Sequence, residues 1–421
     1  FSSMAVRDAS AAGHVDDSFS VKRSRTVNSA QATVDTPRRY VHPLALPPAS
    51  ESNLWAPPLS AEAARSWAKQ GFALVDGLLP EDLVDRCKHE CFEVEGRVTG
   101  KLSTGGFGAF VFPSHLDIVN EVSLHPRLIA ASAQLLGSQD VRLSQADIHR
   151  KQYVPPPWGD FNNQDQRIHM DYPNHTLLHP PPWGDPEAVA MILYMDNVEE
   201  CGGATAVVPR EGTDDDLYKF PFTKTPGTGD VPWINNREKA EAYLAEKHPD
   251  VARFRQQLYQ REVFSHFRKG TVLLYRHDLW HRGTPLLEGA SRVAMNLVFK
   301  LGGLDWFTSW QQGWARSMYY SGGPDGSPGP PQFSKFARFL ATCSVKQRSC
   351  LGFPPPGHKY WTEETLALID ARFGPLGFDS GPYATALRDE DRCTETELDL
   401  DAKLLHAEVS SLRAEVACLR K

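Results

Sequence analysis

The chain has 421 residues, of which 41% are hydrophobic and 23% charged, a composition that allows a sizeable buried core. Its formal net charge of −7 argues against broad binding to nucleic acid or anionic membranes, which needs a basic surface. No apolar run approaches the ~18 residues that a membrane-spanning helix requires. Residues 1–50 mix arginine and serine with aspartate, so we expect an extended arm, either a docking segment or the remnant of a transit peptide.

Three helices precede the first long strand. Each has a capping residue or proline at its start and a glycine after its end. They are predicted over residues 61–70, 80–95 and 126–136, with a short strand at 72–75. The glycine-rich stretch 104–110 lacks the context of a phosphate-binding loop, and we interpret it as a turn beside a pocket.

From residue 141 onward the pattern changes to short apolar strands separated by glycine and proline. These strands are predicted over residues 141–153, 189–195, 204–208, 271–275 and 292–301. Short strands with such breaks favour a barrel or jelly roll over a fold that alternates strands and helices. We therefore expect one mainly β domain with flanking helices over residues 51–375.

Two polar motifs follow strands that lie far apart in the sequence. His169 and Asp171 are two residues apart, and His281 comes just after the strand 271–275. Closing a barrel would bring these strand ends together at one mouth. Two imidazoles and one carboxylate on one side of a metal form the facial triad of non-haem Fe(II) oxygenases, which leaves positions open for a co-substrate and O2. Zinc accepts the same ligands.

Arg292 opens an alternating run eleven residues after His281 and shares a strand face with Asn296. A guanidinium at that depth is suited to a dicarboxylate, which it grips through two parallel N–H···O bonds. Such an arrangement has no obvious use in a zinc hydrolase and therefore favours iron. On the strand that leads to His169, Arg150 and Lys151 are candidates for an anionic substrate or simply for solvent contact.

These motifs, with the segment Cys-Gly-Gly-Ala-Thr-Ala-Val-Val-Pro at 201–209 between them, make the chain resemble the phytanoyl-CoA dioxygenase family. The likeness runs from about residue 61 to about residue 374. It implies a double-stranded β-helix (a cupin-like jelly roll), Fe(II), and 2-oxoglutarate as co-substrate with O2. It makes His169, Asp171 and His281 the iron ligands, and Arg292 the partner of the distal carboxylate of 2-oxoglutarate.

Three further residues are expected beside the co-substrate, namely Asn296, Thr205 and Ile192. The chain departs from the family at Ile192, where an aromatic residue can sit, and at Gly283, where a hydroxyl can stand. The loop at 209–212 also differs from the family's usual Pro-Gly-Ser-His.

A long insertion at residues 210–262 carries two helical patterns, over 237–246 and 250–259. Insertions of this length inside a compact domain are commonly lids, and surface decoration is the alternative. The insertion also holds the cations that a coenzyme A tail would need: Lys219, Lys224, Arg237 and Lys239.

Beyond the barrel, helices are predicted over residues 334–339 and 363–373, with a proline-rich extended segment between them. A linker at 376–396 leads to a coiled-coil helix at 397–420, in which leucines recur every seven residues. Three heptads need packing to persist, so we expect a homodimer or a protein partner, or docking onto the chain's own domain. The leucines are Leu398, Leu405, Leu412 and Leu419.

The expected activity is hydroxylation of a small organic or lipid-like substrate, with succinate and CO2 as co-products. The alternative is a catalytically silent barrel that serves as a structural subunit through its tails. The seven cysteines are odd in number and scattered, which is typical of reduced thiols. They indicate an intracellular location, in the cytoplasm or an organelle such as the mitochondrion.

Overall fold

The computed structural model describes one compact unit within Arg38–Lys421. The described residues are 38–46, 56–95, 110–112, 114, 116–160, 162–172, 176, 178, 183–219, 231–304, 341–345, 348 and 353–388. The predicted coiled coil, most of the N-terminal arm, the helix at 334–339 and most of the glycine-rich turn lie outside them. Within the described part, no helix has the length and apolar character to cross a membrane.

The larger of two mixed sheets has seven strands in the order β2-β3-β9-β6-β11-β5-β4. Its long central strands are antiparallel neighbours, and β2 alone pairs parallel, with β3. The strands are β2 (Leu44–Ala45), β3 (Phe72–Asp76), β4 (Phe110–Val111), β5 (Val141–Gln152), β6 (Ala188–Tyr194), β9 (Val272–Arg276) and β11 (Ser291–Leu301).

The smaller sheet has four short strands in the order β1-β8-β7-β10. They are β1 (Tyr40–Val41), β7 (Thr205–Val207), β8 (Val263–Ser265) and β10 (His281–Gly283). Residues 38–46, expected as part of an extended arm, therefore add one short strand to each sheet.

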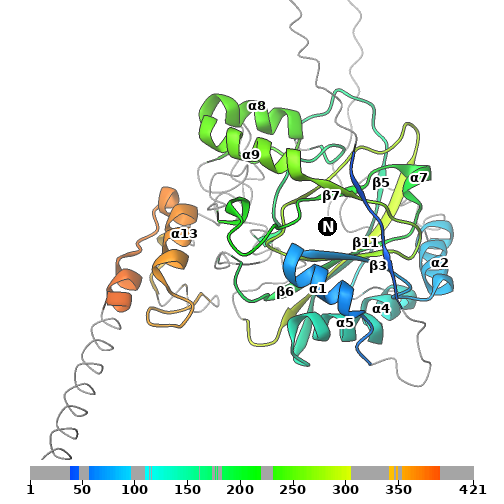
Figure 1. Ribbon diagram of the computed structural model, residues 1–421, viewed down its shortest axis with the longest axis horizontal. Coiled ribbons are helices and arrows are strands. Elements are labelled where there is room, and N and C mark those ends of the chain that lie inside the picture. The colour runs from blue at the N-terminus through cyan, green and yellow to red at the C-terminus, as the bar shows by residue number, and fades with distance from the viewer. Residues whose placement is uncertain are drawn as a thin grey trace, which may run out of the picture. The chain divides into compact units, whose positions relative to one another are not determined.

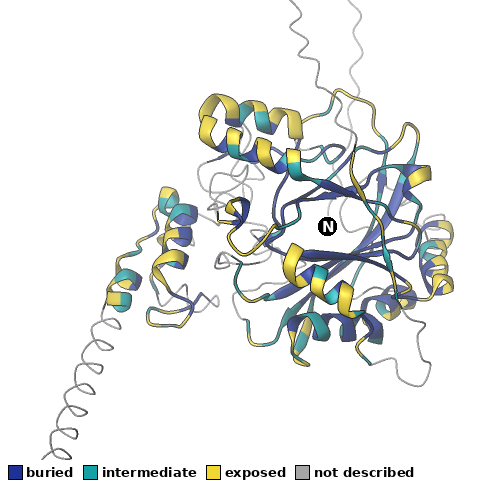
Figure 2. Ribbon diagram, viewed as in Figure 1, coloured by how far each residue is buried: buried dark blue, intermediate teal, exposed yellow. Residues whose placement is uncertain are grey.

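Helices cover the outer face of the larger sheet (Figure 1). They are α1 (Ala61–Gln70), α2 (Glu81–His89), α4 (Asp117–Ser123) and α5 (Pro126–Leu136), and a π-helical turn, η1 (Glu90–Glu95), continues α2. Their apolar sides form one core with alternate strand residues such as Met295 and Leu297 of β11. Figure 2 shows these helices buried toward the sheet and exposed on the outside.

The residues between these on β11 face the other way. Ala294 and Val298 belong to a second core that also contains Ala206 of β7 and Phe264 of β8, so it lies between the two sheets. Arg292 and Asn296 share the face of Ala294 because side chains alternate along a strand. The polar residues singled out on this strand thus point between the sheets.

Two mixed sheets with helices outside agree with the expected sheets and flanking helices, but in the described part more residues are helical than lie in strands, so the fold is not mainly β. The double-stranded β-helix as such stays a prediction. The insertion contains the two expected helices, which end slightly beyond their predicted limits. The remaining elements are α7 (Val198–Cys201), η2 (Asp216–Tyr218), α8 (Arg237–Lys247), α9 (Pro249–Arg261), α13 (Glu363–Phe373) and η5 (Gly374–Leu376). The four described cysteines are buried thiols, as expected.

Candidate metal centre

Backbone pairing places the two candidate histidines side by side. His169 lies in the segment that follows β5, and it exchanges two backbone hydrogen bonds of 2.9 Å with His281 at the start of β10. The two rings stand 4.5 Å apart between centroids. This antiparallel bridge joins residues 112 positions apart, as a closed β fold was expected to do.

The orientation of each imidazole is fixed by the same kind of contact, with the backbone carbonyl two residues earlier. Nδ1 of His169 donates to the carbonyl of Arg167 over 3.0 Å, and Nδ1 of His281 donates to the carbonyl of Leu279 over 3.0 Å. A donating Nδ1 fixes the tautomer in which Nε2 keeps its lone pair. Each ring therefore offers Nε2 as a ligand atom.

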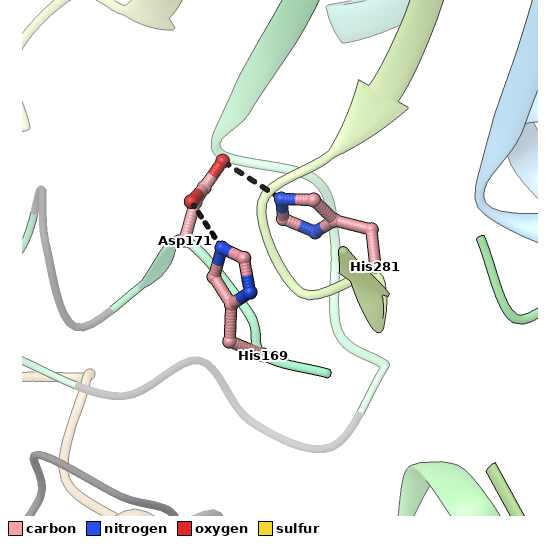
Figure 3. A group of neighbouring side chains, drawn as sticks. All are labelled: His169, Asp171 and His281. Atoms are coloured by element: carbon pink, nitrogen blue, oxygen red, sulfur yellow. Dashed lines mark ion pairs between the residues drawn. The ribbon is translucent and has the colours of Figure 1, made fainter. Parts of the chain in front are cut away.

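The carboxylate of Asp171 faces both of these nitrogens (Figure 3). Its Oδ1 lies 3.7 Å from Nε2 of His169, and its Oδ2 lies 3.4 Å from Nε2 of His281. Ligand atoms of the three residues all lie within 4.8 Å of one another, so the group could hold a metal ion.

The protonation states suit a metal site. Burial, assisted by the neighbouring His281, lowers the pKa of His169 to about 3, so this imidazole is neutral at ordinary pH. Burial also acts against protonation of His281, but the Asp171 carboxylate outweighs it and raises the pKa of that ring. A cation bound here would replace the proton that His281 and Asp171 hold between them.

Helix α9 supports the ligand segment from outside. Arg255 donates to the carbonyl of Ile168 over 2.9 Å, and the Ile168 amide donates to the Tyr259 hydroxyl over 3.0 Å. Glu241 of α8 accepts from Arg255 and from Tyr259, at 2.6 and 2.7 Å for the closest contacts. Both backbone groups of the residue before His169 are therefore held by the insertion.

Arg292 is buried between the sheets, where it donates to the carbonyl of Gly203 and lies over the ring of Tyr194, 5.8 Å from its centroid. Among the described residues no carboxylate pairs with it, and its Nε has no hydrogen-bond partner. A buried cation without a counter-charge is unfavourable in free energy, so this guanidinium is suited to bind an anion.

The other candidate residues for the co-substrate are Thr205, Ile192 and Asn296, and Lys151 is a candidate for an anionic substrate. Thr205 is buried on β7 and accepts a hydrogen bond of 2.7 Å from Tyr194. Ile192 and Asn296 are direct neighbours on β6 and β11 and point between the sheets. Lys151 pairs in register with Arg292, and its ammonium donates to the carbonyls of Gln164 and Thr284 at 2.9 and 2.8 Å.

Two features of the site were not predicted from the sequence. One is Tyr275, which donates to Asp171, and the other is the pair of hydrogen bonds that Arg255 and Tyr259 make with the backbone of Ile168. The position of Tyr275 at the end of the apolar strand before His281 was the available signal. Among the described residues, the group of His169, Asp171 and His281 is the one set of three that could hold a metal ion.

A scan of the chain against protein-family models finds no match, and neither does a search of curated proteins. Solved structures do show a likeness. The non-heme alpha ketoglutarate dependent carbocyclase SnoK from nogalamycin biosynthesis is 19% identical, with a TM-score of 0.41 over 67% of this chain and 96% of that one. HygX from Streptomyces hygroscopicus, solved with nickel and 2-oxoglutarate bound, is 14% identical, with a TM-score of 0.38 over 58% and 88%.

Proposed function

We propose that this chain is an Fe(II)- and 2-oxoglutarate-dependent oxygenase, of the phytanoyl-CoA dioxygenase kind, that hydroxylates a small organic substrate. The convergence of two imidazole nitrogens and one carboxylate carries the proposal. This donor set occupies one side of an ion and is typical of non-haem iron oxygenases. Iron and 2-oxoglutarate together would supply the oxidising chemistry that places one atom of O2 on a substrate carbon and releases succinate and CO2.

The chain's own residues would provide binding and orientation. His169, His281 and Asp171 would hold the metal, and the Nδ1 contacts of both rings keep their Nε2 lone pairs directed at it. Arg292 would bind the distal carboxylate of 2-oxoglutarate, since it lacks an anionic partner among the described residues. The apolar core between the sheets would limit access of water to the reacting atoms.

The chain is less well suited to an acyl-coenzyme A as its substrate. Three of the four cations considered for such a tail are already in ion pairs within the chain: Lys219 with Asp214 and Asp216, Arg237 with Asp165, and Lys239 with Asp160. The fourth, Lys224, lies outside the described residues. The diphosphate of coenzyme A would have to compete with these carboxylates for the cations. This favours a substrate without a nucleotide tail.

Anaerobic titration tests the proposal. Addition of Fe(II) and 2-oxoglutarate should produce a weak visible metal-to-ligand charge-transfer band. His169→Ala should abolish the band, whereas His266→Ala, which changes a partly exposed histidine paired with Glu199, should keep it. Arg292→Met should retain metal binding but raise the 2-oxoglutarate concentration needed.

The absence of any band, together with the absence of succinate from 2-oxoglutarate in air, would contradict the oxygenase. The alternative of a structural subunit would then take its place.

A further inference from the structure

The inward face of β5 carries a carboxylate that the metal centre does not use. Ala146 and Ile148 pack into the core beneath the helices, so Asp147 between them points between the sheets. In the strand register Asp147 stands directly opposite Asn296 of β11. The two side chains are thus cross-strand neighbours on one face.

The Asp147 carboxylate is buried but only partly satisfied. The residue is 1% exposed, and its Oδ2 accepts a hydrogen bond from the side-chain amide of Gln145. Its Oδ1 has no hydrogen-bond partner among the described residues, and Nδ1 of His149 lies 3.8 Å from it. A buried oxygen left without a donor is unfavourable, and more so when it is charged.

Asn296 shows that solvent reaches this place. It is partly exposed, although Met295 and Leu297 on either side of it are fully buried. Its side-chain amide makes no hydrogen bond to the described residues. Because Asn296 faces between the sheets, the accessible space beside it lies there, next to the unsatisfied oxygen of Asp147.

This place lies apart from Arg292, the residue proposed to bind 2-oxoglutarate. Lys151, opposite Arg292, is four residues from Asp147 along β5, a distance of about 13 Å along a strand. Toward the metal, one row across the sheet is formed by Asp147 of β5, Asn296 of β11, Ile192 of β6 and Leu273 of β9. Tyr275, two residues beyond Leu273 on β9, shares their face. Tyr275 donates a hydrogen bond to Asp171, so this face of the sheet leads from the proposed metal ligands to Asp147.

We propose that Asp147 and Asn296 form a substrate subsite that selects a hydrogen-bond donor, a hydroxyl or an ammonium group, close to the carbon that reacts. The inference rests on the proposed function and narrows its substrate class. A donor would satisfy Oδ1 of Asp147, while the amide of Asn296 can bind the same group or its neighbour. A purely apolar chain would leave the carboxylate unsatisfied, and an anionic group would be repelled by it.

Labelling of a cysteine placed in the subsite tests this without a known substrate. Asn296→Cys keeps Asp147 in place and provides a thiol beside it. The chain, loaded with Ni(II) and 2-oxoglutarate, is treated with four methanethiosulfonates that carry an ammonium, a hydroxyl, a methyl or a sulfonate group. Rates are read by mass spectrometry on the peptide that contains residue 296 and divided by each reagent's rate with free cysteine.

We expect the ammonium reagent to react about tenfold faster than the methyl reagent, and the sulfonate to react more slowly than either. Adding Asp147→Asn, which changes charge but hardly shape, should reduce the ammonium preference to about threefold or less. If the hydroxyl reagent also exceeds the methyl reagent, the subsite accepts alcohols; if only the ammonium does, it selects amines.

Three results would overturn the subsite: no reaction with any reagent, a rate for the sulfonate that equals that of the ammonium, or a preference that survives Asp147→Asn. Labelling requires no turnover and can be repeated on the metal-free chain. Its outcome is therefore distinguishable from a failure of the iron titration.

Discussion

The hydroxyl of Tyr275 donates a hydrogen bond of 2.7 Å to Oδ2 of Asp171, the oxygen that also faces Nε2 of His281 at 3.4 Å. Tyr275 lies on β9, directly opposite Ala190 of β6, and its ring lies 4.9 Å from that of His281. A donor at this point fixes the rotation of the carboxylate, so that Oδ1 is left toward His169.

Tyr275→Phe should therefore weaken metal binding while it leaves the three ligands in place. Loss of a partner to a metal-binding carboxylate typically costs about 10- to 100-fold in affinity. Titration with Co(II), followed by its visible spectrum, measures the change. Tyr218→Phe is the matched control, because this buried tyrosine donates to the carbonyl of Val208 and not to a ligand. Equal loss of affinity in both variants would contradict a specific role for Tyr275.

The hydrogen bonds of Arg255 and Tyr259 to the backbone of Ile168 give a second prediction. Arg255 has a fully buried side chain and pairs with Glu241, so Arg255→Met removes the donor to the Ile168 carbonyl and leaves Glu241 without a cation. Breaking a buried ion pair costs about 3–5 kcal/mol. We expect the free energy of unfolding to fall by roughly this amount and metal affinity to fall with it. Urea unfolding and Co(II) titration measure the two effects.

The control lies on the same helix. Arg253 pairs with Asp250, but the two side chains are 70% and 86% exposed, so Arg253→Met should change stability by less than about 1 kcal/mol. Where Arg255→Met proves too unstable, Tyr259→Phe removes only the hydroxyl between Ile168 and Glu241. A Tyr259→Phe variant with the metal affinity of the parent would show that the insertion does not position His169.

A third prediction concerns acid stability and His277. Burial lowers the pKa of this imidazole to about 4; the Asp171 carboxylate opposes the effect and His281 adds to it. Between pH 6.5 and 4 the unfolded chain binds a proton at this residue that the folded chain does not. The free energy of unfolding therefore falls as the pH falls through this range, by up to about 3 kcal/mol from this group.

His277→Gln should remove that part of the pH dependence. Urea unfolding of the metal-free chain at several pH values between 7 and 4 compares the two slopes, and the difference between them isolates His277 from other titrating groups. A variant with the slope of the parent would assign the acid sensitivity to other residues.

Much of the frame could be predicted from the sequence, because contiguous apolar runs mark β6 and β9, and a mostly apolar run marks β11. The proximity of His169 and His281 was also predictable, since each follows a strand and a closed β fold joins strand ends. Strands β8 and β10 were not predicted. They have three residues each, which is too short for a periodic signal.

The side chains that hold the ligand segment from positions far away in the sequence could not be predicted. Arg255 meets Ile168 across 87 residues, and no pattern in the insertion indicates which of its arginines turns inward. Similarly, β5 pairs with β11 through a register shift beside Val298, and the faces of a strand can be assigned only when such a shift is known. Lys151 was considered for an anionic substrate or for solvent, yet its ammonium binds two backbone carbonyls.

The last prediction concerns the glycine pair before β7. Gly202 has φ 66° and ψ −147°, a conformation that residues with a side chain avoid, and a Cβ there would lie 2.9 Å from the backbone nitrogen of Leu287. Gly212 also has a positive φ, 81°, but a Cβ there would meet nothing within 4 Å. Gly212→Ala should therefore cost about 1 kcal/mol, and Gly202→Ala about 2–4 kcal/mol.

The difference between the two variants has a consequence for binding. The carbonyl of Gly203, next in the chain, accepts the hydrogen bond of Arg292, so a displaced backbone at Gly202 should move the guanidinium. We expect Gly202→Ala to weaken 2-oxoglutarate binding about tenfold with little change in metal affinity, and Gly212→Ala to change neither. Thermal unfolding and 2-oxoglutarate titration of the Co(II)-loaded chain measure both effects. Equal stability losses would show that the backbone beside Leu287 yields without cost, and that the close approach does not explain this glycine.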